Sequence, residues 1–430
     1  MSGGQISSIW AGHSIRFRVP PDRSILHAVS LPAEQFRIRS LALPVYLPTF
    51  LFAVGQGAAI PMLPLLALDM GLSVPMAGLL VALRSVGTLL FDIPAGLLVS
   101  RFGERKAMML GAALLSLVAV GVGTRPPVAL LIVLVVLMGA AWSIWVLARL
   151  AYATEVAPIH HRGRVMSLMG GSTRIGHFLG PLLGGLAVGL WGLTSAFFVQ
   201  AVVALGAYVV LRLVQSGAGR EGTTEQTSLK VVGRMLSDHR RVFATAGLVT
   251  IAIQIVRASK DAMIPLWGNH IGLTAGQIAL IFGLTYAADM TLFYPVGVVM
   301  DRFGRKWAGV PCLVMVSVGL MVIPFTRDFV ALLLAGLLIG FGNGLGAGIN
   351  MTLGSDFSPR GRTAEFLGAW RLVTDVGAVG GPLLIAGITA AVSLAAASFF
   401  AAVVGVAGAG ILGLLVPETL LPPESIIEDT

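Results

Sequence analysis

The sequence predicts an all-α membrane protein in which twelve transmembrane helices form two six-helix bundles. Three observations support this fold class. The 430-residue chain is 56% hydrophobic and 11% charged, whereas a soluble globular protein carries about 25% charged residues. Twelve apolar stretches occur along the chain, each close to the ~20 residues that a helix needs to cross a bilayer core. Features of the first half recur in the second at a constant shift of 201 residues.

The apolar stretches fall into two groups of six, separated by the one long polar segment of the chain. We place the helices at 43–68, 75–99, 107–124, 128–153, 165–190 and 194–213, and then at 241–268, 275–300, 308–326, 329–355, 363–390 and 393–416. The chain accordingly divides into an N-terminal tail (1–40), a first bundle (41–213), a linker (214–240), a second bundle (241–416) and a C-terminal tail (417–430).

Lysine and arginine are distributed unequally between the two sides of the predicted membrane domain. The N-terminal tail, the linker region and the loops on their side hold 21 of the 29 basic residues, and the opposite side holds Arg125 and Arg327. Because basic residues gather on the cytoplasmic side, we expect a multi-pass protein of the cell membrane with both termini in the cytoplasm. The same bias explains the formal charge of +9 without a nucleic-acid partner.

The internal repeat extends over most of the chain. The shift of 201 residues superposes Pro64 on Pro265 and Pro94 on Pro295. It also superposes two motifs, namely Arg101-Phe102-Gly103 on Arg302-Phe303-Gly304, and Gly176, Gly180 and Pro181 on Gly377, Gly381 and Pro382. Six spans separate the copies, and an even number gives the halves the same orientation. A parallel repeat is typical of transporters whose substrate site lies between the two halves.

One loop motif and one helix motif carry a resemblance to a known family. The loop Gly297–Lys306 reads Gly-Val-Val-Met-Asp-Arg-Phe-Gly-Arg-Lys, and Gly96–Lys106 is a diverged copy. This motif resembles the loop motif of the major facilitator superfamily. The run Gly176–Gly185 resembles the antiporter motif of the proton-linked drug exporters in that superfamily. The resemblance covers all twelve spans and implies the major facilitator fold, with transport by rocking of two bundles.

The chain departs from the exporter pattern at three positions. Ser100 stands where the first loop copy of the family has an acid, and Ser167 stands at the opening glycine of the antiporter motif. The arginine expected midway along the fourth span is absent, and Arg149 lies nearer the cytoplasmic end. Separately, the segment Pro417-Glu418-Thr419, at the end of the last predicted helix, resembles a short motif of the sugar porters.

The two basic loops are interpreted as gating elements or, alternatively, as plain determinants of topology. We expect Asp301 to face the positive end of a neighbouring helix, Arg302 to pair with Asp356, and Arg101 to pair with Glu155. The family resemblance implies that such contacts hold the cytoplasmic side closed, and more strongly in the second half. The residues assigned to this role are Gly96, Arg101, Gly103, Arg105, Glu155, Gly297, Asp301, Arg302, Gly304, Arg305, Lys306 and Asp356.

Glycine and proline in the fifth span of each half are expected at close helix contacts, because small residues let transmembrane helices approach each other. Proline loosens the hydrogen-bond ladder of the helix. The pattern permits either tight packing alone or a part in conformational coupling. The residues concerned are Gly176, Gly180, Pro181, Gly184, Gly185, Gly377, Gly381 and Pro382.

Ionisable residues inside the spans are the strongest indication of function, because charge is costly in hydrocarbon. There are six cations (Arg84, Arg149, Arg174, Arg257, Lys260 and Arg371) and four acids (Asp92, Asp261, Asp289 and Asp375). We assign eleven polar residues to a substrate or proton path, namely Gln56, Asp92, Arg174, His177, Gln254, Arg257, Lys260, Asp261, Asp289, Arg371 and Asp375.

Two interpretations of these charges stay open at this point. Arg257 with Asp261 and Arg371 with Asp375 share helix faces, so they can be closed structural pairs instead of cavity residues. Asp289 has no opposite charge on its own helix and is our first candidate for a proton carrier, with Asp92 second. Aromatic residues near the cavity, such as Trp142, Trp145, Tyr286 and Trp370, are expected either to line an apolar pocket or to face lipid.

The sequence lacks the patterns of an enzyme. No phosphate-binding glycine loop, nucleophile–base pair or metal-ligand cluster is present, and the single cysteine, Cys312, excludes an intramolecular disulfide. We therefore expect neither cofactor nor metal, and a monomer in the bilayer. The favoured function is proton-coupled efflux of drug-like or amphipathic compounds. The alternatives are transport of a small organic anion or metabolite, and a sensor or scaffold with a transporter fold.

Overall fold

The computed structural model describes residues 38–158, 161–214, 229–359 and 361–420. The predicted tail up to residue 37, most of the predicted linker and residues 421–430 lie outside the described residues. Within the described residues the regular secondary structure is entirely helical, as the apolar composition predicts.

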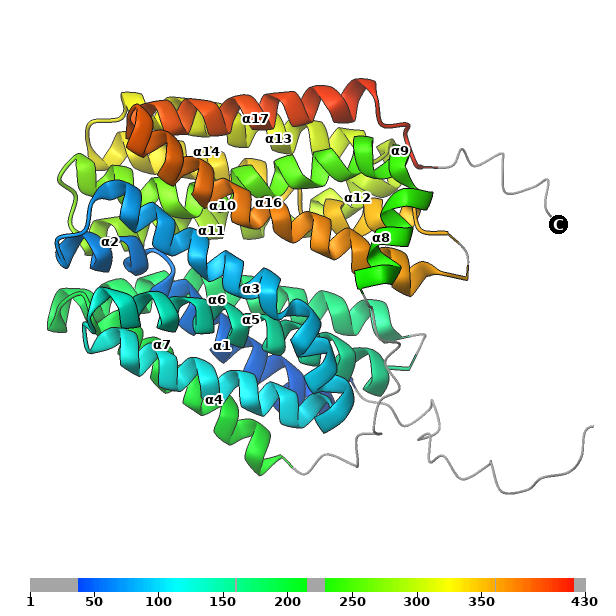
Figure 1. Cartoon of the computed structure of the whole chain (residues 1–430), viewed down its shortest axis with the longest axis horizontal. Helices are drawn as coiled ribbons and strands as arrows, with labels where there is room; N and C mark the ends of the chain where they lie inside the picture. The colour runs from blue at the N-terminus through cyan, green and yellow to red at the C-terminus, as the bar shows by residue number, and fades with distance from the viewer. Residues whose placement is uncertain (1–37, 159–160, 215–228, 360, 421–430) are drawn as a thin grey trace, which may run out of the picture. The chain divides into compact units, whose positions relative to one another are not determined.

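The helices follow one another in two series (Figure 1). The first series is α1 Leu47–Ala59, α2 Met62–Asp69, α3 Val74–Phe102, α4 Glu104–Gly123, α5 Val128–Val156, α6 Arg162–Trp191 and α7 Ser195–Leu213. Two short helices, α8 Leu229–Asp238 and α9 Arg240–Val242, precede the second series. That series is α10 Leu248–His270, α11 Ala275–Thr291, α12 Phe293–Phe303, α13 Lys306–Val322, α14 Phe329–Leu345, α15 Ile349–Asp356, α16 Thr363–Ala391 and α17 Leu394–Leu414.

These helices occupy the twelve predicted spans when α1–α2, α11–α12 and α14–α15 are each taken as one broken span. Within the part of the chain that the structure describes, ten helical segments are long and apolar enough to cross a membrane, or eleven if α11 and α12, bent by 40°, form one span. α6 fills the place of the fifth predicted span but is not among them. Its sequence contains Arg162, Arg164 and Arg174, which lower its mean hydropathy.

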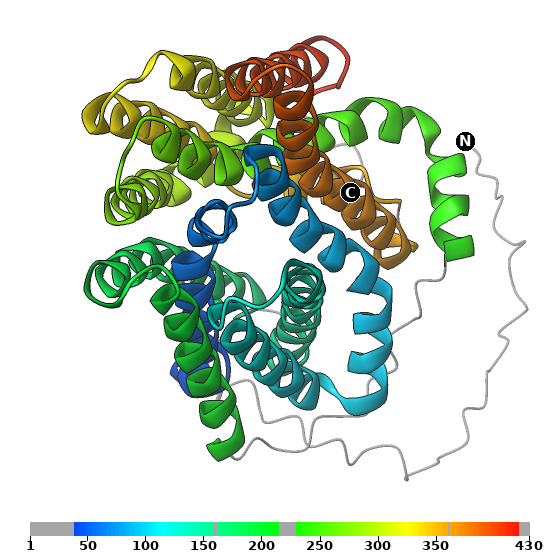
Figure 2. The same cartoon turned by 60° about the vertical axis from the view of Figure 1, so that its left-hand side comes forward.

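The duplication predicted from the 201-residue shift is visible in the packing. In the first half α1 contacts α6 and α7, α4 contacts α5 and α7, α3 contacts α5, and α6 contacts α7. The corresponding helices of the second half make the same six pairs, with α10, α11, α13, α14, α16 and α17 in the equivalent places. Figures 1 and 2 show the blue-to-green first half beside the green-to-red second half.

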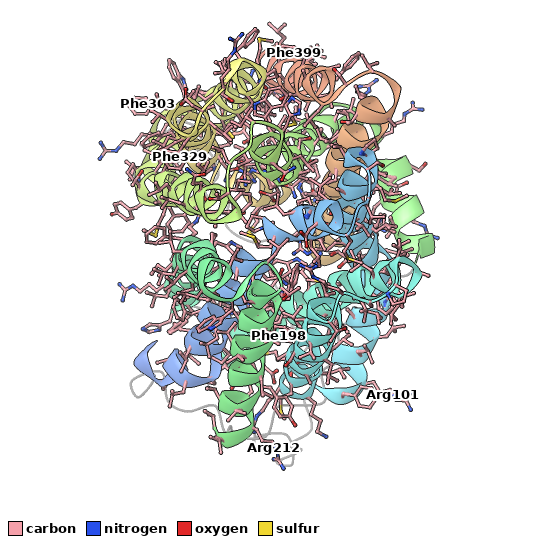
Figure 3. All side chains as sticks on the ribbon, turned by 90° about the vertical axis from the view of Figure 1, so that its left-hand side faces the viewer. Arg101, Phe198, Arg212, Phe303, Phe329 and Phe399 are labelled. Carbon is pink, nitrogen blue, oxygen red and sulfur yellow. The ribbon has the colours of Figure 1, made fainter. Side chains whose placement is uncertain are left out.

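The two halves meet along two seams. α6 packs against α11, and α3 packs against α16. These contacts are equivalent under the repeat, because each joins the second span of one half to the fifth span of the other. Figure 3 views the halves end-on, with the side chains of the first half below those of the second. The space between the seams is where a site shared by both halves would lie.

The glycine–proline runs pack mainly inside their own half. A Cβ at Gly180 would collide with the backbone of α1 at Val54 and Gly57, and a Cβ at Gly381 would collide with the equivalent helix α10 at Ile255. Gly185 is an exception, because it faces Ala279 of α11 in the other half. The close approach that the sequence predicts is therefore confirmed, and it fixes the fifth span of each half against the first.

Both copies of the loop motif end a helix at glycine. Gly103 follows α3 with φ +81° and ψ 158°, and its equivalent Gly304 follows α12 with φ +106° and ψ 167°. This backbone conformation is essentially restricted to glycine. We call the end of the bundles that carries these two loops the basic end. α8, in the predicted linker, packs against α16 there, and Asp238 lies 3.6 Å from Arg362.

Candidate functional site

A cavity of about 280 Å³ lies between the two halves. Six of the residues predicted to form a substrate or proton path line it, namely His177, Gln254, Arg257, Lys260, Asp261 and Asp375. The lining also includes Ile60, Arg84, Ser85, Thr88, Trp142, Ala258, Tyr286, Asn343 and Ala378. The sequence therefore predicted the second-half wall of the cavity better than the first-half wall, where Arg84 is the main charge.

Lys260 and Asp261 form a salt bridge on the cavity wall, with 2.5 Å between Nζ and Oδ1. The Lys260 ammonium also lies 4.6 Å from the ring centre of Tyr286. The alternative pairing of Arg257 with Asp261 is wrong. Arg257 donates instead to the Gly346 carbonyl oxygen at 2.8 Å, in the break between α14 and α15, where the same oxygen also accepts from the Ile349 N–H at 3.2 Å.

Asp289 is paired across the first seam. Its carboxylate lies 2.7 Å from the Arg174 guanidinium of α6, and both side chains are largely buried. Arg174 also lies over the ring of Phe293, 4.6 Å from its centre. The absence of an opposite charge on its own helix made Asp289 the first candidate for a proton carrier. That reason does not hold, because the partner comes from the other half.

Three charged side chains meet at the second seam. Arg371 of α16 lies 3.0 Å from Asp92 of α3 and 3.6 Å from Asp375 on its own helix. Asp92 also accepts a hydrogen bond from Ser143 at 2.5 Å. Asp92 and Asp375 are therefore neighbours that share Arg371 as an ion-pair partner. One arginine thus faces two neighbouring carboxyl groups, and one bound proton would balance the charge of the group.

The remaining predicted polar residues hold or neighbour the cavity wall. Gln56 accepts a hydrogen bond from Arg84 at 2.8 Å, and Gln254 accepts one from Asn350 at 3.4 Å. The His177 ring lies 5.3 Å from that of Tyr286. Arg149 is half-buried beside Thr173 of α6, to which it donates at 3.1 Å, and it does not line the cavity.

The four predicted aromatic residues divide between cavity and core. Trp142 and Tyr286 line the cavity. Trp145 is fully buried and stacks on Phe52, and Trp370 is buried and donates to the Asn350 carbonyl oxygen at 2.9 Å. The lipid-facing alternative is therefore wrong for these residues.

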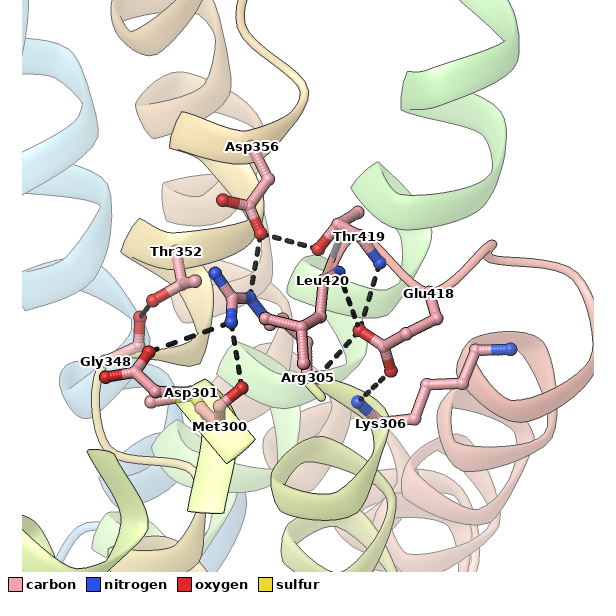
Figure 4. A network of polar contacts seen from close by, with 10 residues as sticks. All are labelled: Met300, Asp301, Arg305, Lys306, Gly348, Thr352, Asp356, Glu418, Thr419 and Leu420. Carbon is pink, nitrogen blue, oxygen red and sulfur yellow. Dashed lines mark hydrogen bonds and ion pairs between the residues drawn. The ribbon is translucent and has the colours of Figure 1, made fainter. Parts of the chain in front are cut away.

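A polar network at the basic end joins four elements of the second half (Figure 4). Arg305 lies 3.0 Å from Asp356 at the end of α15, and it donates to the Met300 carbonyl oxygen at 2.8 Å. Thr419, after α17, donates to Asp356 at 2.5 Å. Asp301, which is 80% exposed, lies 3.8 Å from Arg305. The network therefore connects α12, α13, α15 and the segment after α17.

The predicted partners in the basic loops are wrong in both halves. Asp356 pairs with Arg305, while Arg302 points to the surface and is exposed. Arg305 reaches Asp356 because it follows Gly304, whose backbone turns the chain back toward α15. In the first half Arg101 is also exposed and lies over the ring of Phe102, with no ion pair to Glu155 among the described residues.

Equivalent cations hold the last helix of each half. Arg105 donates to the carbonyl oxygens of Leu211 and Val214, and Lys306 donates to that of Gly413. A cation at a helix C-terminus is favoured by the helix dipole. The residue before this cation differs between the halves. In the first half it is Glu104, which lies beside Glu155. In the second half it is Arg305, which lies beside Asp356. The electrostatic link is thus attractive in the second half alone.

Two glycines assigned to the basic loops, Gly96 and Gly297, border open space, so a Cβ at either position would meet no neighbour.

Glu418 binds the start of α13. Its carboxylate accepts hydrogen bonds from the backbone N–H groups of Arg305 at 2.8 Å and Lys306 at 3.1 Å. Burial raises the pKa of Glu418, but these two donors and the N–H groups of Thr419 and Leu420 outweigh burial and lower the pKa below its ordinary value. The segment after α17 is therefore held by a carboxylate that must be charged.

The lowered pKa of Glu418 predicts a pH-dependent attachment of this segment. Because the folded pKa lies below the unfolded one, the stabilisation is present at neutral pH and is lost as the pH falls through the folded value. We expect the difference in melting temperature between wild type and Glu418→Gln to be largest near neutral pH and to shrink below about pH 4. A thermal melting series in detergent measures it, and a difference independent of pH would contradict the expectation.

The comparisons with known proteins agree with this architecture. A family model described as Major Facilitator Superfamily matches residues 45–260 and 246–428. Multidrug resistance protein 2 of Bacillus subtilis is 23% identical over 291 residues, which cover 66% of this chain and 73% of the relative. A multi-drug resistance efflux pump PmrA homolog of Lactococcus lactis is 26% identical over 364 residues, which cover 80% of this chain and 88% of the relative.

A solved structure has the same fold at low sequence identity. A POT family transporter in complex with a thioalcohol-conjugated peptide superposes with a TM-score of 0.73 at 11% identity. The match covers 87% of this chain and 96% of that chain.

Proposed function

Because the chain belongs to the major facilitator superfamily, whose members are transporters and not enzymes, we propose that it is a proton-coupled secondary transporter that exports amphipathic, drug-like compounds by alternating access. The observation that carries the proposal is the charged cavity between the two halves, which are joined by an ion pair on each seam. The names of the two multidrug resistance relatives support export of this substrate class. Their identity to this chain is low, so the cavity itself carries the argument.

The seams supply contacts that rocking of the halves can break and re-form. On each seam the acid comes from the second span of one half and the arginine from the fifth span of the other, as Asp289 with Arg174 and Asp92 with Arg371. Transporters with a parallel repeat alternate by movement of one bundle against the other around a central site. We assign the two ion pairs to the state in which these seams are closed.

The coupling proton is assigned to the carboxyl pair of Asp92 and Asp375. A single arginine cannot balance both acids, so a proton shared by the two carboxyl groups would make the group neutral. Asp92 is held by Ser143 as well as by Arg371, whereas Asp375 borders the cavity. Asp375 is therefore the member that exchanges its proton with the substrate path.

The basic end is assigned to the cytoplasm, because it carries most of the basic loop residues, and both termini are placed on that side of the cell membrane. The network around Arg305 lies within the second half. Any gating role would therefore act by keeping the ends of α12, α13 and α15 together as a rigid unit while the bundle moves. Glu418→Gln tests this role too, since gating requires a changed balance of inward and outward access in cysteine-accessibility measurements.

Transport by purified protein in proteoliposomes tests the proposal. With a panel of fluorescent amphipathic compounds that carry acidic, neutral or basic head groups, we expect accumulation driven by an imposed pH gradient. Counterflow without any response to the gradient would reject proton coupling. Neither counterflow nor accumulation of any compound would favour the alternative of a sensor or scaffold.

A further inference from the structure

The charges inside the spans do not balance. Among the described residues, each intramembrane acid has a basic partner, as Asp289 with Arg174, Asp261 with Lys260, and both Asp92 and Asp375 with Arg371. The same set of ion pairs leaves three intramembrane arginines without a carboxylate, namely Arg84, Arg149 and Arg257. Two of these, Arg84 and Arg257, line the central cavity.

Arg84 and Arg257 reach the cavity from opposite halves, on α3 and α10. In the described part of the chain Arg84 donates a hydrogen bond to the Gln56 side chain, and Arg257 donates one to the Gly346 carbonyl oxygen and also lies beside the neutral Cys312 thiol. Both acceptors are neutral. A guanidinium group has five N–H donors, so most of the donors of each group are left for something else. The Nε atom of each arginine is buried without a hydrogen-bond partner.

Two unpaired guanidinium groups beside one cavity are unfavourable unless an anion joins them. Each group loses hydration on burial, and two positive charges at one cavity repel each other. A carboxylate is the group that matches a guanidinium in shape and charge, through charge-assisted hydrogen bonds. The nearby Asp261 does not serve this purpose, because it is held at 2.5 Å by Lys260.

We propose that Arg84 and Arg257 together bind the anionic head group of the substrate, and that the substrate is an amphipathic organic monocarboxylate. This inference rests on the proposed transport function and names its substrate class. The apolar part of such a molecule fits the remaining wall, where Trp142, Tyr286 and Ala378 line the cavity. Because the guanidinium groups come from opposite halves, an anion between them also links the two bundles. An amphipathic cation would add to the unbalanced positive charge.

A series of ligands with one body and three head groups tests the proposal. The probes are 4-phenylbutyrate, 4-phenylbutanol and 4-phenylbutylamine, and their affinities for purified wild-type protein are measured by calorimetry at neutral pH without any pH gradient. We expect the carboxylate to bind about tenfold or more tightly than the alcohol, because hydrogen bonds to a charged group are stronger than neutral ones, and the amine to bind most weakly. Equal binding of the three probes, preference for the amine, or no binding of the carboxylate would overturn the proposal.

Variants of the two arginines locate the preference. Arg84→Gln and Arg257→Gln are each expected to reduce the affinity for 4-phenylbutyrate about tenfold while leaving that for 4-phenylbutanol nearly unchanged. Arg327→Gln is the matched control, since Arg327 is exposed. Arg84→Lys and Arg257→Lys keep the positive charge but lose the guanidinium group. They replace the glutamine variants in this test if the latter fold poorly. Glutamine variants that fold and retain the preference would overturn the assignment.

The size of the anion is tested with acetate, which has the head group alone. Weak binding of acetate supports an amphipathic substrate, and binding as tight as that of 4-phenylbutyrate would overturn that part of the proposal. These affinities are independent of proton coupling. Loss of the anion preference with gradient-driven transport intact would reject the substrate class alone, whereas an intact preference without gradient-driven transport would reject the coupling alone.

Discussion

Replacing Arg174 with alanine is expected to cost about 3–5 kcal/mol of folding free energy, the range found when one partner of a buried ion pair is removed. Asp289 lies at the seam between the halves, and its side chain is 7% exposed. Without Arg174 this carboxylate would be charged and uncompensated between α6 and α11. The free energy of unfolding, measured by denaturant titration in mixed micelles, gives the cost.

The expectation is specific to the charge of the pair. The double variant Arg174→Ala with Asp289→Asn should recover most of the loss, because no unpaired charge is left. Arg125→Ala is the matched control, since Arg125 pairs with Asp69 at 2.5 Å while both side chains are about half exposed, and exposed pairs contribute about 0–1 kcal/mol. A cost for Arg174→Ala no larger than that for Arg125→Ala would contradict a structural role for the seam pair.

The fold was predictable because hydropathy and repetition act over long stretches of chain. The twelve spans and the two halves follow from apolar length and from the 201-residue shift, and the close contact at Gly180 follows from the absence of a side chain. Breaks within spans were not predicted. The interruption after Leu345, for example, contains the Gly346 carbonyl oxygen that accepts a hydrogen bond from Arg257, and no hydropathy pattern marks it.

The partners of the site residues were not predictable, because sequence spacing shows neighbours on one helix and not neighbours across a seam. Asp289 therefore looked unpaired, and Asp261 looked matched to Arg257. Arg84 was counted among the intramembrane cations, but nothing in its own span indicated that it faces the cavity. The only indication of a role for Glu418 in the sequence was the Pro417-Glu418-Thr419 segment. Its contact with the start of α13 joins residues far apart in the sequence, so it could not be predicted.

Replacing Asp375 with asparagine is expected to abolish transport driven by a pH gradient while leaving counterflow within about twofold of wild type. The amide is a permanent mimic of the protonated acid. It removes the second negative charge beside Arg371 and leaves Asp92 with its own partners, Ser143 and Arg371. Coupling free energies of about 1–3 kcal/mol correspond to roughly 5–150-fold in affinity, so the loss of proton-driven accumulation should be plain in proteoliposomes.

Asp289→Asn is the matched comparison, because Asp289 is also an intramembrane carboxylate but is balanced one-to-one by Arg174. Because Arg174 compensates its charge, Asp289 is not expected to take up a proton during transport. The Asp289→Asn variant should therefore keep the response to the pH gradient. Asp92→Asn should lose the response, as the other member of the carboxyl pair. If Asp289→Asn lost the gradient response and Asp375→Asn kept it, the proton site would lie on the α6–α11 seam, and the residue favoured by sequence alone would be the carrier.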